Sequence, residues 1–304
     1  IYALAAYYKA SRDPEALDLA IKTFRWLEKF SHDPIYKGYF QRLQRNGEPL
    51  ARTHATPPLA TDGYKDQNSS IHLLEAFTEL YEVWPDPLLE ERLQEMLTLI
   101  RDTIVTAKGN LTLFLQPDWT PVSFADSSKE VILQHARIDH LSFGHDVETA
   151  YLLFEASHRL GLRQDTATLN RGKRMVDQAL QNGWDTLVGG FYDEGYYFRE
   201  DDRPSIIRDT KNWWTQAEGL NTLLLMANLY PNDPMQYFNK FTQLWQYVKT
   251  YLIDHEHGEW YDSGLDKEPE ARNRQKGHIW KAAYHSYRSL TNCIKELQTP
   301  TAPR

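Results

Sequence analysis

The repeated pairing of helical segments constrains the fold of this chain more than any other feature. Apolar residues recur at three- and four-residue spacing, as in Leu73, Leu74, Phe77, Leu80 and Tyr81, which is the pattern of an amphipathic helix. Nine such segments are predicted, eight of them in consecutive pairs. The pairs are 1–11 with 14–30, 66–83 with 87–106, 145–160 with 165–182, and 211–229 with 234–254, and a last helix covers 280–297.

Short turns divide the helices of three pairs. An aspartate stands before a proline at Asp13-Pro14, Asp86-Pro87 and Asp233-Pro234. Aspartate accepts hydrogen bonds from the free N–H groups of a first helical turn, and proline is tolerated there, so each dipeptide predicts a helix start. Segments rich in aromatic residues follow the pairs, and we expect short strands or hairpins at 38–40, 111–116, 189–198 and 258–265.

Helix pairs that recur about every 70 residues indicate an α/α toroid or an α-solenoid. Solenoid repeats are shorter and rarely carry aromatic hairpins, so we predict an all-α, closed ring of helical hairpins with the site on the inner helices. A ring of six hairpins needs twelve helices, and the nine predicted here leave the first three missing. The chain also opens at Ile1 inside a helical pattern, so Ile1, Leu4 and Tyr8 are expected to face solvent or a partner. We predict one catalytic domain over 1–304.

Composition narrows the class of protein. The net charge of -8 argues against nucleic-acid binding, which usually needs a basic face. The single cysteine, Cys293, excludes an intramolecular disulfide and a cysteine-rich metal site. No apolar run is long enough to span a bilayer. We expect a cytoplasmic protein, monomeric or weakly oligomeric, without a membrane or nucleic-acid partner; a disulfide-free periplasmic protein fits the same composition.

Three histidines lie near the starts of separate predicted helices: His72, His145 and His285. If the helices lie side by side in one register, the imidazoles converge, and histidine suits proton transfer because its ordinary pKa lies closest to neutral. Glu148 stands three residues after His145, on the same helical face, and is predicted to hold that ring. An equally good reading makes His145 a helix cap and Glu148 a first-turn acid.

Asn68 lies four residues before His72, so one helical face carries both side chains. They suit the binding of a substrate hydroxyl or carbonyl, although a buried polar patch is the commoner role of such a pair.

Aromatic and polar residues surround the remaining candidates. Trp213 and Trp214 begin one helix, and because neighbouring side chains point about 100° apart, one is expected to face the pocket and the other the core. Gln216 and Glu218 are unusual polar residues before an apolar run, and Trp280 precedes His285. Tryptophan stacks on sugar faces, but Trp213 and Trp214 also suit a core. Trp280 is expected to stack from the loop edge while His285 points inward, although His285 also suits an interior position.

No phosphate loop, nucleophile elbow or zinc-protease motif is present, and no metal site is predicted. A glycosidase with paired carboxylates stays open, with Asp62, Asp66 and Glu218 as its acids.

Four segments together resemble the cellobiose 2-epimerases of the N-acylglucosamine 2-epimerase superfamily. They are KDQNSSIHLLEAFTELY, SFGHDVETAYLL, KNWWTQAEGL and WKAAYH, which occur in the family's order over essentially the whole chain. The resemblance implies an (α/α)6 barrel and epimerisation at C2 of the reducing-end sugar of β-1,4-linked disaccharides, without metal or cofactor. The family's three further N-terminal helices, with a substrate-binding arginine and a nearby tyrosine, have no counterpart here.

The resemblance also implies roles for individual residues. His145 and His285 are the expected general acid/base pair, with Glu148 supporting His145. His72 is expected to assist at the substrate oxygens, and Asn68 is expected to bind the substrate. Trp214 and Trp280 are expected to stack on the sugars, with Trp213 beside them. The alternatives are a sister enzyme acting on mannose or N-acylglucosamine, and a non-catalytic sugar-binding fragment.

Overall fold

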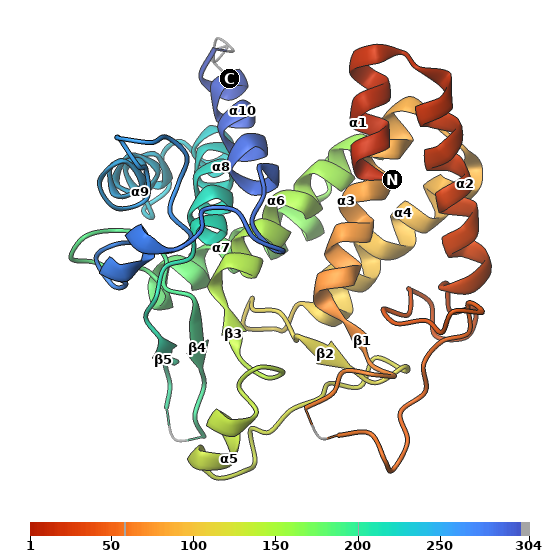
Figure 1. Ribbon diagram of the computed structural model, residues 1–304, viewed down its shortest axis with the longest axis horizontal. Helices are drawn as coiled ribbons and strands as arrows, with labels where there is room; N and C mark the ends of the chain where they lie inside the picture. Colours follow the sequence, from red (N-terminus) through yellow and green to blue (C-terminus); the bar gives the residue numbers. More distant parts are fainter. Residues whose placement is uncertain (58, 200, 299–304) are drawn as a thin grey trace. The chain divides into compact units, whose positions relative to one another are not determined.

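Helix starts in the structure follow the capping residues in the sequence. In this computed structural model, which describes residues 1–57, 59–199 and 201–298, Asp13 accepts a hydrogen bond from Glu15 N, and Asp86 accepts from Leu88 N and Leu89 N. Pro14 and Pro87 occupy the first helical positions behind them, where the missing N–H costs no hydrogen bond. Helices dominate the described residues, and the strands are two to four residues long (Figure 1). The all-α prediction is confirmed.

The described residues group into two compact units. Unit 1 comprises Ile1–Ala107, Leu111–His140 and Leu152–Arg171, and unit 2 comprises Lys108–Asn110, Leu141–Tyr151 and the described residues from Gly172 on. Two helices, α6 (Phe143–Arg159) and α7 (Thr166–Asn182), contribute residues to both units.

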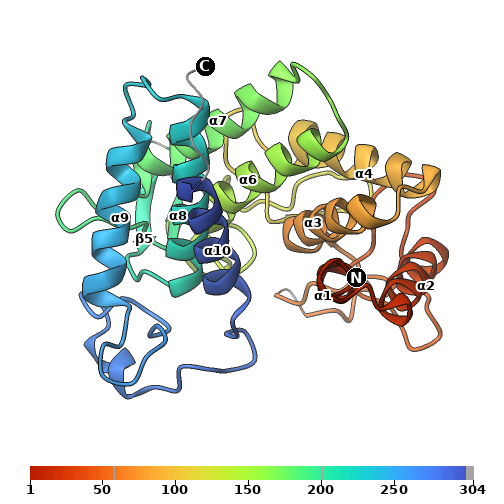
Figure 2. The ribbon, with the colours of Figure 1, turned by 90° about the horizontal axis from the view of Figure 1, so that it is seen from above.

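Unit 1 consists mainly of two helical hairpins. α1 (Tyr2–Ser11) packs on α2 (Pro14–Phe30), α3 (Gln67–Val83) packs on α4 (Pro87–Leu99), and α1 also contacts α3 (Figures 1 and 2). A π-helical turn, Ile100–Ile104, extends α4. The strand β1 (Lys65–Asp66) pairs antiparallel with β2 (Phe114–Leu115), and the short α5 covers Lys129–Gln134.

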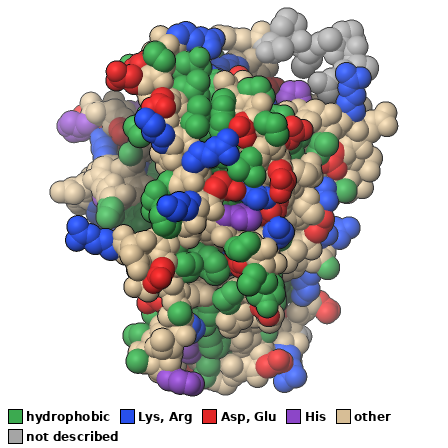
Figure 3. All heavy atoms as spheres, turned by 90° about the vertical axis from the view of Figure 1, so that its right-hand side faces the viewer, with side chains coloured by type: hydrophobic (Ala, Val, Ile, Leu, Met, Phe, Trp, Pro, Cys, Tyr) green, Lys and Arg blue, Asp and Glu red, His purple; other side chains and the backbone are tan. Residues whose placement is uncertain are grey.

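The core of unit 1 lies between these hairpins. Phe24 and Phe77 are fully buried and meet edge to face, with ring centroids 5.3 Å apart. Each such side chain contributes roughly 1.5–3 kcal/mol by leaving water. On the face that includes α1 and α2, hydrophobic side chains also reach the surface between acidic and basic ones (Figure 3). Ile1, Leu4 and Tyr8 are partly exposed there.

Unit 2 is centred on α8 (Trp213–Leu229). This helix packs against α9 (Tyr237–Tyr251) on one side and α10 (Tyr284–Gln298) on another. Thirteen of its seventeen residues are buried, which is expected of an inner helix with neighbours around it. A small antiparallel sheet in the order β3-β4-β5 stands beside it, formed by Leu141–Ser142, Glu194–Tyr196 and Ser205–Arg208.

A loop closed by a lysine recurs in both units, and in two of its three copies the lysine is fully buried. In its clearest form, Asp185 accepts hydrogen bonds from Leu187 N and Val188 N, and Lys211 Nζ donates to the Asp185 carboxylate and to the Gly189 carbonyl. Gly189 and Gly190 have φ of 85° and 86°, a region that suits glycine. The same arrangement joins Asp33 to Lys65 and the Lys37 carbonyl, and Asp254 to Lys276 and the Gly258 carbonyl.

These lysine-closed loops coincide with three of the four aromatic segments predicted after the helix pairs, those at 38–40, 189–198 and 258–265. In each loop the residues that flank the turn form an isolated β-bridge, and the partners are His32 with Tyr39, Trp184 with Phe191, and Ile253 with Trp260. Short hairpins are therefore present at three of the four predicted segments, each closed by one lysine, and the fourth, 111–116, contains β2 and bridges to Val105 through Leu111.

Two predicted helix starts are wrong. The sequence predicted a helix from Pro234, but α9 begins at Tyr237 because Asp233 accepts from Met235 N and Gln236 adopts a left-handed φ of 53°. The last helix was expected from Trp280 and begins at Tyr284, since His278 and Lys281 pair across a tight turn. None of the helices described here is both long and apolar enough to cross a bilayer.

Candidate functional site

Three helices that contribute to unit 2 bring half of the predicted site residues together. α6 carries His145 and Glu148, α8 carries Trp214 and Glu218, and α10 carries His285. The Trp214 ring lies between the two imidazoles, with centroids 4.6 Å from His145 and 5.7 Å from His285. The sequence predicted one site for three histidines, and two of them, His145 and His285, contact the same Trp214 ring.

His145 is held at the start of α6. Its Nδ1 lies 2.7 Å from Oγ of Ser142, the last residue of β3. Beside it, Gly144 allows Trp214 to approach closely, because a Cβ at Gly144 would lie 2.6 Å from the Trp214 ring and 2.5 Å from Thr215 Oγ1. Strand β3, the glycine and the tryptophan together therefore fix the His145 ring.

His285 is held by a carboxylate. Its Nδ1 lies 2.7 Å from Glu218 Oε1 and 3.9 Å from Glu148 Oε1, and both carboxylates are buried. Burial lowers the pKa of His285 below its ordinary 6.5, while Glu148 opposes that shift, so a neutral imidazole is favoured at pH 7. With Glu218 ionised, Nδ1–H donates to the carboxylate and Nε2 keeps the lone pair of a base.

Glu148 lies on the His285 side of the cluster. It was predicted to support His145, and its Oε1 accepts a hydrogen bond of 3.0 Å from Arg288 Nη2. Burial raises the pKa of Glu218 above its ordinary value, and the Arg288 guanidinium, with Nη2 2.7 Å from Oε1, opposes that rise by stabilising the ionised carboxylate.

Arg288 is a residue of this cluster that the sequence reasoning missed. Its Nη2 lies 2.7 Å from Glu218 Oε1, and its Nη1 donates to the Tyr284 hydroxyl at 2.7 Å. The signal was present in the sequence, because Arg288 follows His285 by three residues and so shares its helical face.

The donor atoms of Glu148, Glu218 and His285 lie within 4.8 Å of one another, a spacing that could hold a metal ion. In this protein Arg288 already places a positive charge against both carboxylates. The cluster is therefore a carboxylate–guanidinium network with an imidazole attached.

Three further predicted residues of unit 2 have different surroundings. Trp213 is buried with its ring edge-on to His278, so of the two neighbouring tryptophans it is the one that faces the core. Gln216 is fully buried, and its amide binds both the N–H and the carbonyl of Phe191. Trp280 is 78% exposed in the loop before α10.

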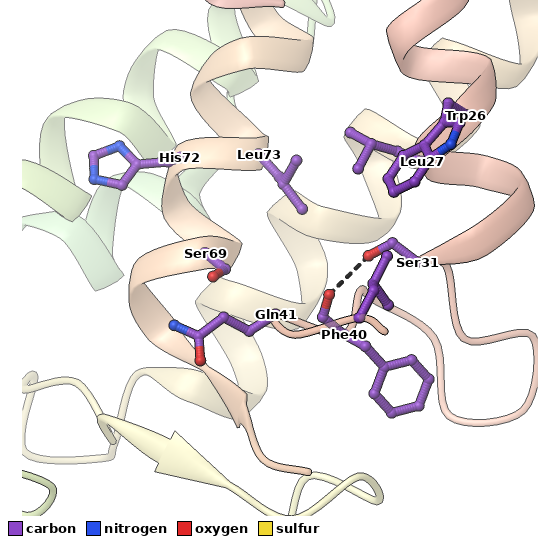
Figure 4. Close-up of a pocket in the computed structure, with 9 residues that line it drawn as sticks. Trp26, Leu27, Ser31, Phe40, Gln41, Ser69, His72 and Leu73 are labelled. Carbon is purple, nitrogen blue, oxygen red and sulfur yellow. Dashed lines mark hydrogen bonds between the residues drawn. The ribbon is translucent and has the colours of Figure 1, made fainter. Parts of the chain in front are cut away.

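Asn68 and His72 lie in unit 1, on the first turns of α3. Asp66 caps this helix by accepting from Ser69 N at 2.7 Å, and Asn68 is exposed. His72 Nδ1 lies 3.2 Å from Glu75 Oε2. His72 also borders a cavity of about 480 Å³ whose lining is mainly apolar (Figure 4). The labelled lining residues are Trp26, Leu27, Ser31, Phe40, Gln41, Ser69, His72 and Leu73.

The acids of the glycosidase alternative serve other contacts. Asp66 caps α3, and Asp62 pairs with Arg42 at 3.0 Å. Glu218 binds His285 and Arg288.

Comparison with known proteins identifies the class. The solved structure of cellobiose 2-epimerase from Bacillus thermoamylovorans matches with a TM-score of 0.80 and 25% identity, over 97% of this chain and 69% of that chain. The predicted fold class, helical hairpins of an α/α barrel protein, is confirmed by this match. The fold is that of helical sugar epimerases.

The family follows from the sequence comparison. The model of the N-acylglucosamine 2-epimerase (GlcNAc 2-epimerase) family matches residues 44–289, and the chain belongs to this family. Cellobiose 2-epimerase of Bacteroides fragilis is 28% identical over 97% of this chain and 70% of its own length. Cellobiose 2-epimerase of Ruminococcus albus is 30% identical over 97% of this chain and 69% of its own length. The predicted enzyme class, a carbohydrate epimerase or isomerase, is confirmed.

Proposed function

We propose that this protein epimerises the reducing-end sugar of β-1,4-linked disaccharides such as cellobiose and lactose at C2, using His145 and His285 as the two proton-transfer groups. The observation that carries the proposal is the placement of both imidazoles against the Trp214 ring, each fixed through Nδ1. The similarity to cellobiose 2-epimerases supports the substrate class.

The reaction starts from the open-chain sugar. Its C1 carbonyl acidifies the proton on C2, which one neutral histidine removes to leave an enediolate. Rotation about the C2–C3 bond of the enediolate presents its opposite face to the other histidine, which starts protonated and gives its proton to C2. One proton leaves and one arrives, so the product is the C2 epimer with no change in oxidation state.

The surrounding residues have defined parts in this proposal. Glu218 orients His285 through Nδ1, so that Nε2 faces the reacting carbon. Trp214 supplies a flat apolar surface between the bases, and exposed Trp280 supplies a second one for the sugar. Asn68 and His72 are proposed as donors to substrate oxygens, and such donors stabilise the developing oxyanion.

Proton NMR in deuterated water tests the proposal. Cellobiose incubated with the protein should yield glucosyl-mannose that carries deuterium at C2. The matched control is the doubly substituted His145→Ala/His285→Ala protein, which should leave the C2 signal intact. Free glucose would instead indicate a glycosidase, and turnover of mannose or N-acylglucosamine without turnover of cellobiose would indicate a sister epimerase.

A further inference from the structure

We propose that Arg288 is a positioning residue that keeps Nε2 of His285 free of a proton, because its guanidinium balances the two carboxylates that share the site. The proposal rests on the proposed function for its catalytic meaning. Its physical content concerns the protonation of one imidazole and can be measured without a substrate.

Arg288 contacts both buried glutamates through a single nitrogen atom. One nitrogen, Nη2, lies 2.7 Å from Glu218 Oε1 and 3.0 Å from Glu148 Oε1. The same Glu218 oxygen lies 2.7 Å from His285 Nδ1. Arg288 is 8% exposed and both glutamates are at most 1% exposed in their side chains, so water screens these charges little.

Every element packed around His285 contributes to its electrostatic surroundings. α6 supplies Glu148 and, across Trp214, His145. α8 supplies Glu218, and α10 itself supplies Arg288 and the Tyr284 ring, whose centroid is 4.5 Å from the imidazole. Among these groups the guanidinium is permanently charged, because arginine keeps its proton throughout the usable pH range.

The net charge of the cluster shows the effect of the Arg288 guanidinium. With both glutamates ionised and His285 neutral, the cluster carries a net charge of -1 when Arg288 is counted, and -2 without it. A buried charge of that size draws in a proton. The extra proton would sit on His285 or on Glu218, which share one hydrogen bond.

Both locations of that proton have the same consequence. A proton on the imidazole gives a ring with hydrogen on both nitrogens. A proton on Glu218 makes the carboxyl the donor to Nδ1, so the single hydrogen of the neutral ring moves to Nε2. In each case Nε2 can no longer accept the proton of C2, and removal of Arg288 disables the base without touching it.

Nitrogen NMR of histidine-labelled protein measures this directly, since the ¹⁵N shift of Nε2 reports whether that atom carries hydrogen. In Arg288→Met, Nε2 of His285 should lose its hydrogen at a pH on the order of 1–3 units higher than in the wild type. Arg288→Lys should restore most of the wild-type titration, because it keeps the charge. Arg288→Gln keeps hydrogen-bond donors but not the charge, so its titration should match that of Arg288→Met. It replaces Arg288→Met in the experiment if Arg288→Met folds poorly.

Arg92→Met is the matched control. Arg92 is a largely covered arginine, 11% exposed in its side chain, that bonds Glu28 at 2.8 Å, Glu95 at 3.1 Å and Glu91 at 2.7 Å in unit 1. Its loss should leave the His285 titration unchanged. Coincident titrations of Arg288→Met, Arg288→Gln and the wild type would overturn the proposal.

Kinetics connects the titration to the reaction. For cellobiose epimerisation, Arg288→Met should lower kcat on the acid limb of the pH profile by about 10- to 1000-fold, with KM changed much less. If no epimerisation is found but the ¹⁵N titration shifts, the proposed function fails and the role of Arg288 in protonation stands. If epimerisation is found but the titration does not shift, the role of Arg288 is overturned and the proposed function stands.

Discussion

Replacement of Lys211 by methionine tests the energetic role of the lysine-closed loops. The Lys211 ammonium is fully buried and donates three hydrogen bonds, to Asp185 at 2.8 Å, Asp266 at 2.8 Å and the Gly189 carbonyl at 3.0 Å. The Tyr247 ring lies 4.5 Å from it. Methionine keeps most of the apolar stem but leaves both aspartates without their cation.

The expected loss can be worked out from these contacts. Hydrogen bonds to charged groups contribute about 1.5–3 kcal/mol each, so three give roughly 4–9 kcal/mol. The desolvation of a buried ammonium, several kcal/mol, offsets part of this sum. The remainder agrees with the roughly 3–5 kcal/mol that removal of one partner from a buried ion pair costs. We expect Lys211→Met to lower the free energy of unfolding by that amount.

Urea denaturation followed by circular dichroism measures the loss. Lys267→Met is the matched control, because Lys267 bonds Asp209 at 2.9 Å at the surface, and it should cost no more than about 1 kcal/mol. Equal losses in the two variants would refute the reasoning, since burial of the ion pair would then make no difference.

The same variant has a predicted pH dependence. Burial alone would raise the pKa of Asp185, but the hydrogen bond from Lys211 and those from the loop N–H groups hold it below its ordinary 3.8. A carboxyl with a lowered pKa stabilises the fold above about pH 4 and loses that contribution as pH falls through the folded pKa. The difference between wild type and Lys211→Met should therefore be full near neutral pH and shrink below pH 4.

Three other outcomes are expected. His145→Ala and His285→Ala should each lower kcat for cellobiose by about 10²–10⁴-fold, and near-normal turnover in either would make that histidine structural. Exhaustive chelation should leave the rate unchanged, because the proposed proton transfers use side chains alone; rescue by one added divalent ion would contradict this. Gly144→Ala should displace Trp214 and cost about 1–3 kcal/mol, as read from tryptophan fluorescence and urea denaturation. Gly277→Ala, whose Cβ would meet nothing nearer than 3.8 Å, is its control and should be silent.

Local patterns in the sequence were enough to predict the paired helices and several of the site residues. Asp13 and Asp86 cap helices by contacts with residues two or three positions on, so their roles can be read from a short window. The same kind of reading failed at Asp233, because Gln236 turns the chain left-handed before α9 starts. A capping signal therefore marks a turn reliably, while the first helical residue depends on the backbone that follows.

Contacts between distant residues could not be read in this way. Lys65 and Lys211 stand in the segments that resemble the family, but their partners lie 32 and 26 residues away, and no short pattern gives such pairs. Glu148 bonds Arg288, 140 residues on, and no local pattern around Glu148 gives this partner. Gln216 shows the same limit, since its side chain binds the backbone of Phe191, 25 residues earlier in the chain.

The lysine-closed loops also bear on how the chain folds during synthesis. Each loop opens with its aspartate and is fastened by a lysine made later, 32 residues on for Asp33, 26 for Asp185 and 22 for Asp254. The bond between the lysine and the aspartate can thus form once the next segment of chain has left the ribosome, before the whole protein has been made. Because these separations are short, the entropy lost on closing each loop is small. Each of the three loops can therefore close as soon as the segment that carries its lysine has been made.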